Sequence, residues 1–89
     1  MTTVGETILL VDDMPANLEM LIQELIKNNY RVLIAETGKF ALECVRYAPV
    51  DIILLDVILS DMDGFEICRQ FKANPALQNV PVLFISALD

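Results

Sequence analysis

Ile8-Leu9-Leu10-Val11-Asp12-Asp13 and Ile52-Ile53-Leu54-Leu55-Asp56 are two short apolar runs, and each of them ends in carboxylates. Apolar runs of this length, bounded by polar residues, are typical of strands buried on both faces, as in a parallel sheet. Ligands of open parallel sheets bind beyond the carboxyl ends of the strands. If the two strands are neighbours, the three aspartates meet there. Charges about 4 Å apart repel by roughly 4 kcal/mol at an effective dielectric near 20, so the cluster requires a cation, and carboxylate oxygens favour Mg²⁺.

The composition indicates one small domain with an apolar core. The 89 residues are 55% hydrophobic, and no run approaches the roughly 18 apolar residues of a membrane span, so we expect no membrane association. The formal net charge of −7 argues against binding to nucleic acid. The first six residues lack a basic segment followed by an apolar stretch, so we expect no signal peptide and a cytoplasmic location.

Two residue types limit the chemistry further. The chain has no histidine, which excludes histidine-based catalysis and histidine-ligated zinc within it. Cys44 and Cys68 fall in separate helical patterns without C-x-x-C spacing, so we expect buried free thiols.

The remaining sequence alternates between helix and strand patterns. Pro15 suits the first turn of a helix, which Asn28 and Asn29 end. Its apolar stripe is Leu18, Leu21, Ile22, Leu25 and Ile26. Two later helices carry the stripes Phe40, Ala41, Cys44, Val45 and Phe65, Cys68, Phe71, and strands are expected over residues 30–35, 51–57 and 82–86. The order βαβαβαβ implies parallel strands joined by right-handed crossovers.

Three motifs, in this order, resemble the receiver domain of two-component response regulators. They are Ile8-Leu9-Leu10-Val11-Asp12-Asp13, Asp56-Val57-Ile58-Leu59-Ser60-Asp61-Met62-Asp63-Gly64 and Val80-Pro81-Val82-Leu83-Phe84-Ile85-Ser86-Ala87. The resemblance implies that residues 1–89 form a single α/β domain, a flavodoxin-like doubly wound parallel sheet with strand order 2-1-3-4. The family's fourth helix, fifth strand and fifth helix have no counterpart, so the resemblance also implies truncation at the C-terminus.

The resemblance gives each motif a role. Asp56 becomes the phosphoacceptor, and the expected Mg²⁺ ligands are Asp12, Asp13, Asp56 and the backbone carbonyl of Ile58. Ser86 resembles the switch hydroxyl, and Ala87 resembles the small residue that leaves room beside it. Asp63 and Gly64 are expected to form a turn, with glycine adopting a backbone conformation that other residues resist.

Structural roles are the alternatives for the aspartates. Asp56 in isolation would be a polar strand end or a turn former. Asp12 or Asp13 would cap the first helix.

The resemblance implies a signalling module rather than an enzyme, which accepts a phosphoryl group from a histidine kinase or phosphotransfer protein. The segment Asp12-Asp13-Met14-Pro15-Ala16-Asn17-Leu18 looks most like receivers attached to hybrid kinases or cyclic-dinucleotide enzymes. The family's essential lysine has no counterpart among Lys27, Lys39 and Lys72, so we expect impaired phosphorylation.

Two other functions compete with this one. A Mg²⁺-dependent phosphohydrolase with an aspartyl nucleophile would carry a second aspartate two residues later, where Ile58 stands. A module that binds partners without phosphorylation is the other alternative. Because the missing elements would leave one sheet face and the fourth strand uncovered, we expect a homo-oligomer formed through them.

Overall fold

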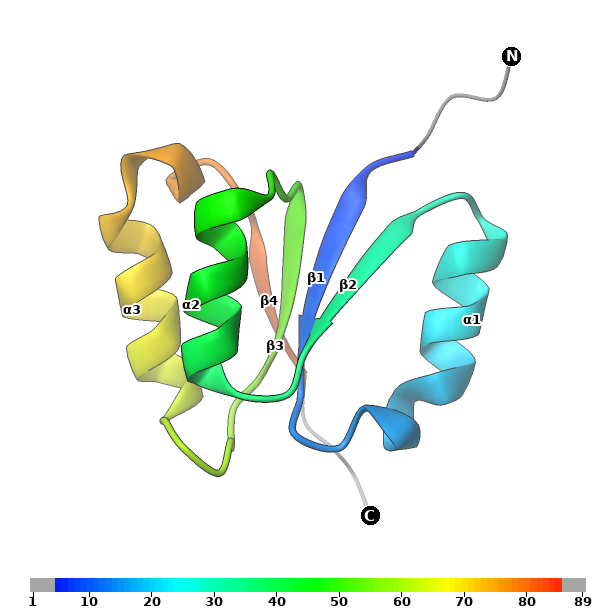
Figure 1. Cartoon of the computed structure of the whole chain (residues 1–89), viewed down its shortest axis with the longest axis horizontal. Helices are drawn as coiled ribbons and strands as arrows, with labels where there is room; N and C mark the ends of the chain where they lie inside the picture. The colour runs from blue at the N-terminus through cyan, green and yellow to red at the C-terminus, as the bar shows by residue number, and fades with distance from the viewer. Residues whose placement is uncertain (1–4, 86–89) are drawn as a thin grey trace.

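The central sheet has four parallel strands in the order β2-β1-β3-β4, as expected from the resemblance (Figure 1). The computed structural model describes residues 5–85. The elements, with η for 3₁₀ helices, are β1 (Thr7–Val11), η1 (Pro15–Leu18), α1 (Glu19–Lys27), β2 (Arg31–Ala35), α2 (Gly38–Tyr47), β3 (Ile52–Asp56), α3 (Gly64–Ala73), η2 (Pro75–Leu77) and β4 (Val82–Ile85).

The register makes β1 and β3 neighbours along their whole length. Leu10 lies opposite Leu54, and Val11 lies opposite Leu55, so the next residues along the two segments, Asp12 and Asp56, lie at the same level. The residue after β1 and the last residue of β3 therefore come together at one edge of the sheet. This is the arrangement that the two apolar runs with terminal carboxylates predict if the runs form neighbouring strands, as the resemblance implies.

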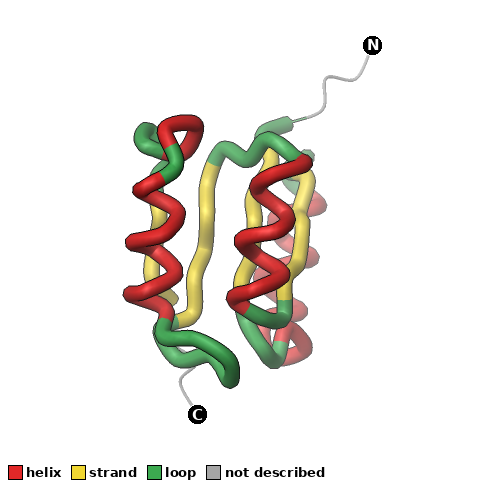
Figure 2. Tube along the Cα trace, turned by 60° about the vertical axis from the view of Figure 1, so that its left-hand side comes forward, coloured by secondary structure: helices red, strands yellow, loops and turns green. Residues whose placement is uncertain are grey.

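The hydrophobic core lies between the sheet and the pair α2 and α3, which cover the same face (Figures 1 and 2). Alternate residues of the strands point into it, because successive side chains of a strand point to opposite faces. The fully buried members are Leu9, Val11, Ala35, Ala41, Ile53, Leu55 and Ile67. Phe71 of α3, 1% exposed, is the largest side chain among them. Helix α1 packs on the opposite face, where Leu10 is buried.

The first helix differs from the sequence-based expectation. Pro15 does lie in its first turn, but that turn is the 3₁₀ helix η1, and the α-helix begins at Glu19. No residue of α1 is fully buried; Leu21 is 37% exposed and Ile26 is 55% exposed. Helix α1 packs on the β2 side of its sheet face, so part of the predicted apolar stripe stays in contact with solvent.

Two predicted stripe residues of the later helices are also exposed. Phe40 is 53% exposed and lies with Ile34 along the outer edge of β2. Phe65 is 57% exposed and packs against Phe84 of β4, with 4.9 Å between the ring centroids. Both aromatic rings lie at the edges of the sheet, where among the described residues no further element covers them.

Within residues 5–85, no helix has both the length and the apolar content needed to cross a bilayer.

Candidate functional site

Three carboxylates meet where β1 and β3 end. Asp12 and Asp13 follow β1, and Asp56 is the last residue of β3. Each offers one carboxylate oxygen, and these oxygens lie within 4.8 Å of one another. The structure therefore brings together the three aspartates that the sequence selected. We call this group the acidic cluster.

Both buried aspartates of the acidic cluster also hold the chain that leaves their strands. Asp12 is 2% exposed, and its Oδ1 accepts a hydrogen bond from the backbone N–H of Met14 at 2.7 Å. Asp56 is 6% exposed, and its Oδ1 accepts from the N–H of Ile58 at 3.2 Å. Neither η1 nor α1 has a side-chain cap at its N-terminus, so the capping role considered for Asp12 and Asp13 is not observed.

The electrostatics of the acidic cluster favour a cation. Burial raises the pKa of Asp12 above its ordinary value, and the negative charges of Asp56 and Asp13 raise it further, although the bond from Met14 opposes the shift. The ionised form of Asp12 is therefore energetically unfavourable in the absence of a counter-charge. Hard oxygen donors of this kind match the ligand preference of Mg²⁺, which retains several waters and needs few protein ligands.

The loop of residues 57–63 leads from the acidic cluster to α3. The Ile58 side chain is 78% exposed, so at this position only the backbone is available to the cluster. Asp63 is the N-cap of α3, because its side chain accepts a hydrogen bond from the N–H of Phe65 at 2.8 Å. It therefore ends the loop by starting the helix.

The expected reason for glycine at position 64 is wrong. No glycine in the described part of the chain has a positive φ, so no unusual backbone conformation is needed at Gly64. Glycine is required by close packing instead. A Cβ atom would lie 2.5 Å from the backbone carbonyl oxygen of Asp56 and 2.8 Å from Cα of Val57.

Asp61 has a structural role that the sequence analysis missed. Its Oδ1 accepts from the N–H of Gly38 at 2.9 Å, and its Oδ2 accepts from the N–H of Lys39 at 3.1 Å. These two hydrogen bonds lower the pKa of Asp61. Local sequence patterns give no indication of this contact, because it joins segments more than twenty residues apart and forms only in the folded chain.

Two further predictions from the sequence concern the switch residues and Lys72. Ser86 and Ala87, the expected switch residues, lie outside the described residues. Lys72 is engaged away from the acidic cluster, since its ammonium group donates to the backbone carbonyls of Leu77, Gln78 and Val80. This contact holds the connection between α3 and β4.

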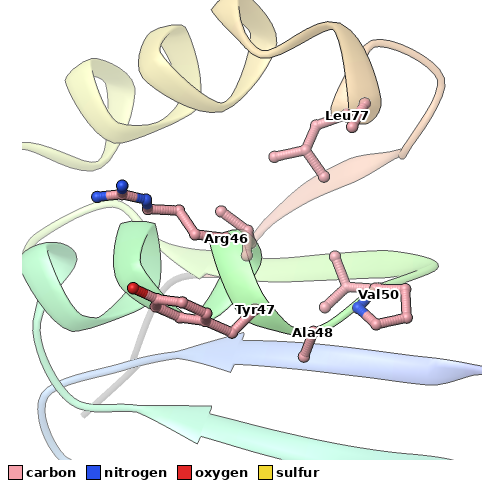
Figure 3. A pocket seen from close by; sticks show the side chains of 8 residues that line it. Arg46, Tyr47, Ala48, Val50 and Leu77 are labelled. Atoms are coloured by element: carbon pink, nitrogen blue, oxygen red, sulfur yellow. The ribbon is translucent and has the colours of Figure 1, made fainter.

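A separate hollow of about 270 Å³ lies between the C-terminus of α2 and η2 (Figure 3). Arg46 and Tyr47 lie on its α2 side, and Leu77 lies across from them. None of its lining residues is acidic. This hollow therefore lacks the carboxylate ligands of a magnesium site, and the acidic cluster remains the candidate site.

Comparison with known proteins agrees with the fold. Residues 8–89 match the family model described as the response regulator receiver domain. The chain is 41% identical over 80 residues to a probable cyclic di-GMP phosphodiesterase of Vibrio cholerae, covering 90% of this chain and 18% of that protein. It is 44% identical over 82 residues to the response regulator PleD of Caulobacter vibrioides, covering 92% of this chain and 18% of that protein. The chain thus spans less than a fifth of these relatives.

Solved structures give the same result. The N-terminal domain of a response regulator receiver protein from Methanoculleus marisnigri superposes with a TM-score of 0.81 at 37% identity, covering 89% of this chain and 64% of that one. The receiver domain of a sensor histidine kinase from Pseudomonas aeruginosa, which has a magnesium ion coordinated in its active site cleft, superposes with a TM-score of 0.82 at 31% identity. That match covers 90% of this chain and 66% of that one. The chain belongs to the family of response regulator receiver domains of two-component systems.

Proposed function

We propose that the chain accepts a phosphoryl group on Asp56 from a histidine kinase or a phosphotransfer protein, and that Mg²⁺ is held by Asp12, Asp13, Asp56 and the backbone carbonyl of Ile58. The observation that carries this proposal is the meeting of three carboxylates within 4.8 Å at the ends of neighbouring parallel strands. The partner supplies the phosphohistidine, since this chain contains no histidine.

The position of Asp56 supports its role as the nucleophile. Its Oδ1 is engaged by the N–H of Ile58, whereas its Oδ2 has no hydrogen-bond partner among the described residues. Attack by Oδ2 on phosphorus forms a carboxyl–phosphate anhydride while the bond from phosphorus to the donor nitrogen breaks. Bound Mg²⁺ would neutralise the negative charge of the transferred group at this site.

Phosphorylation adds about −1.5 to −2 charge at the end of β3. Asp56 lies opposite Ile85 in the register of β3 and β4. Ser86 and Ala87 are the next two residues of the sequence. We propose Ser86 as the hydroxyl that responds to the phosphoryl group and Ala87 as the small residue beside it, as the family resemblance implies.

Incubation with Mg²⁺ and acetyl phosphate, followed by intact-mass measurement, tests the proposal. We expect one phosphoryl group on the wild-type chain and none on Asp56→Asn, which keeps the size of the side chain and its acceptor for Ile58. Omission of Mg²⁺ should also prevent the reaction. Continuous release of phosphate without a labelled chain would indicate a phosphohydrolase instead, and an unchanged mass would indicate an interaction module that works without phosphorylation.

The edge of β4 supports self-association of the 89-residue chain. β4 is an edge strand, so one side of its backbone is not paired within the described sheet. Leu83 is 54% exposed and Phe84 is 42% exposed. An exposed apolar edge strand favours pairing with another chain, so we propose a homo-oligomer that forms through β4 and the adjoining sheet face.

Size-exclusion chromatography with light scattering tests self-association. We expect a mass above the 10.0 kDa of one chain at micromolar concentration. Leu83→Lys places a charge on this surface and should shift the population to monomers, whereas Tyr47→Lys, at the exposed end of α2, serves as the control. A monomeric wild-type chain would contradict this part of the proposal.

A further inference from the structure

The N-terminus of α2 is held by a distant loop. The first N–H groups of an α-helix have no acceptor within the helix. In α2 the third of them, Phe40, donates to the hydroxyl of the local N-cap Thr37 at 3.0 Å. The first two, Gly38 and Lys39, donate instead to the two carboxylate oxygens of Asp61 in the loop of residues 57–63.

The same loop carries the backbone group that the proposed magnesium site uses. Ile58 and Asp63 face each other in an antiparallel bridge, and the N–H of Gly64 donates to the carbonyl of Val57 at 2.9 Å. These contacts close the loop on itself. Asp61 fixes the closed loop to α2, and the partly buried Met62 packs beside it against the core.

We propose that Asp61 is a positioning residue for the magnesium site, which holds residues 57–63 against α2 and thereby fixes the backbone carbonyl of Ile58. This inference rests on the proposed function, since it assumes that Ile58 is a ligand. Asp12, Asp13 and Asp56 are placed by strands β1 and β3, which the core holds rigidly. The Ile58 carbonyl belongs to a loop, so its position depends on the contacts that hold residues 57–63 in place.

Removal of the Asp61 side chain should weaken Mg²⁺ binding without removing a metal ligand. Residues that orient metal ligands from outside the coordination sphere are typically worth about 10- to 100-fold in metal affinity. Because three carboxylates remain, we expect the lower end, about a 10-fold loss, for Asp61→Ala. Asp61→Asn keeps one hydrogen-bond acceptor for the N-terminus of α2. Its Mg²⁺ affinity should therefore lie between that of Asp61→Ala and that of the wild type.

Isothermal titration calorimetry with MgCl₂ and amide hydrogen exchange by NMR form the test. In Asp61→Ala we expect faster exchange at Gly38, Lys39, Ile58 and Gly64, together with the loss of affinity, while the amides of β1 stay protected. Glu36→Gln is the matched control, since it removes an exposed negative charge just before α2 but makes no hydrogen bond to the loop. A titration at about 1 M salt, where the screening length falls to about 3 Å, separates positioning from the loss of charge.

The outcomes distinguish the two proposals. A folded Asp61→Ala chain with wild-type affinity, or a loss that Glu36→Gln or Asp61→Asn reproduces in full and that vanishes at high salt, would overturn the positioning role alone. A wild-type chain that binds no Mg²⁺ would overturn the proposed function and the positioning role with it. A loss that persists at high salt, with faster loop exchange in the same variant, would support the inference.

Discussion

At the scale of single residues, the charge of Asp12 opposes folding until a cation offsets it. Asp12 is almost fully buried beside two other carboxylates, and burial is the main cause of its raised pKa. A carboxyl group whose pKa is raised by folding favours the folded state below its unfolded pKa, and this contribution is lost as the pH rises through the folded value. At neutral pH without metal, ionised Asp12 therefore reduces the free energy of unfolding.

Asp12→Asn should stabilise the metal-free chain. Asparagine removes the charge but keeps an oxygen that accepts the hydrogen bond from Met14. We expect the free energy of unfolding in urea to rise by about 1 kcal/mol at neutral pH, as is common when a strained functional group is replaced. The difference from wild type should shrink as the pH falls and Asp12 becomes protonated. A variant less stable than wild type at neutral pH would show that burial and charge repulsion do not destabilise ionised Asp12.

Gly64 gives a second prediction at this scale. Alanine at this position would bring Cβ to 2.5 Å from the carbonyl oxygen of Asp56, and backbone at both places must shift to relieve the contact. We expect Gly64→Ala to lower the free energy of unfolding by about 1–3 kcal/mol, as overpacking does, and to weaken Mg²⁺ binding because the shift moves Asp56.

Gly5→Ala is the control for this prediction. Its added Cβ would meet the backbone carbonyl of Asn29, near the end of β1 opposite to the acidic cluster. Calorimetry should show weaker Mg²⁺ binding for Gly64→Ala only, whereas urea unfolding should show lower stability for both variants. Equal Mg²⁺ affinity in Gly64→Ala and wild type would contradict the packing argument.

At the scale of elements, the attachment of α2 to the loop of residues 57–63 makes stability depend on pH. The bonds from Gly38 and Lys39 lower the pKa of Asp61. A group whose pKa is lowered by folding stabilises the folded state above its unfolded pKa, and this contribution is lost as the pH falls through the folded value. Between neutral pH and the acid range, wild type should therefore lose more stability than Asp61→Asn. Urea unfolding at a series of pH values measures this, and parallel pH profiles for the two chains would refute it.

The elements also show what sequence patterns reveal and what they miss. The strands were predictable because continuous apolar runs such as Ile52–Leu55 are needed wherever both faces of a sheet are covered. The 3₁₀ start at Pro15 and the exposure of Phe40 and Phe65 were not predictable in this way. Periodicity indicates which side of a helix is apolar, but the extent of burial depends on how far the neighbouring elements reach.

At the scale of the whole molecule, the acidic cluster could be predicted from the sequence because the position of a strand also fixes the position of the residues at its end. Once β1 and β3 are neighbours in register, Asp12, Asp13 and Asp56 must converge. The resemblance supplied the strand order, which the apolar patterns alone left open. The contact of Asp61 with α2 was missed because it depends on the path of a loop across the finished fold, for which no local signal exists.

Mg²⁺ should stabilise the entire chain, because the acidic cluster is assembled from two strands and exists only when the sheet is formed. A ligand that binds only the folded state adds RT ln(1 + [L]/Kd) to the free energy of unfolding, about 2.7 kcal/mol when its concentration is 100 times Kd. We therefore expect the melting temperature of wild type to rise with MgCl₂ concentration and that of Asp13→Ala to change little.

The matched control for this prediction is NaCl at equal ionic strength. The chain carries 13 acidic against six basic residues, and salt alone relieves part of their mutual repulsion. Only the excess of MgCl₂ over NaCl in wild type measures site binding, and Asp51→Asn, at the opposite end of β3 from the cluster, should retain that excess. If Asp13→Ala showed the same excess rise in melting temperature as wild type, the stabilising ion would be bound elsewhere. The acidic cluster would then not be the magnesium site.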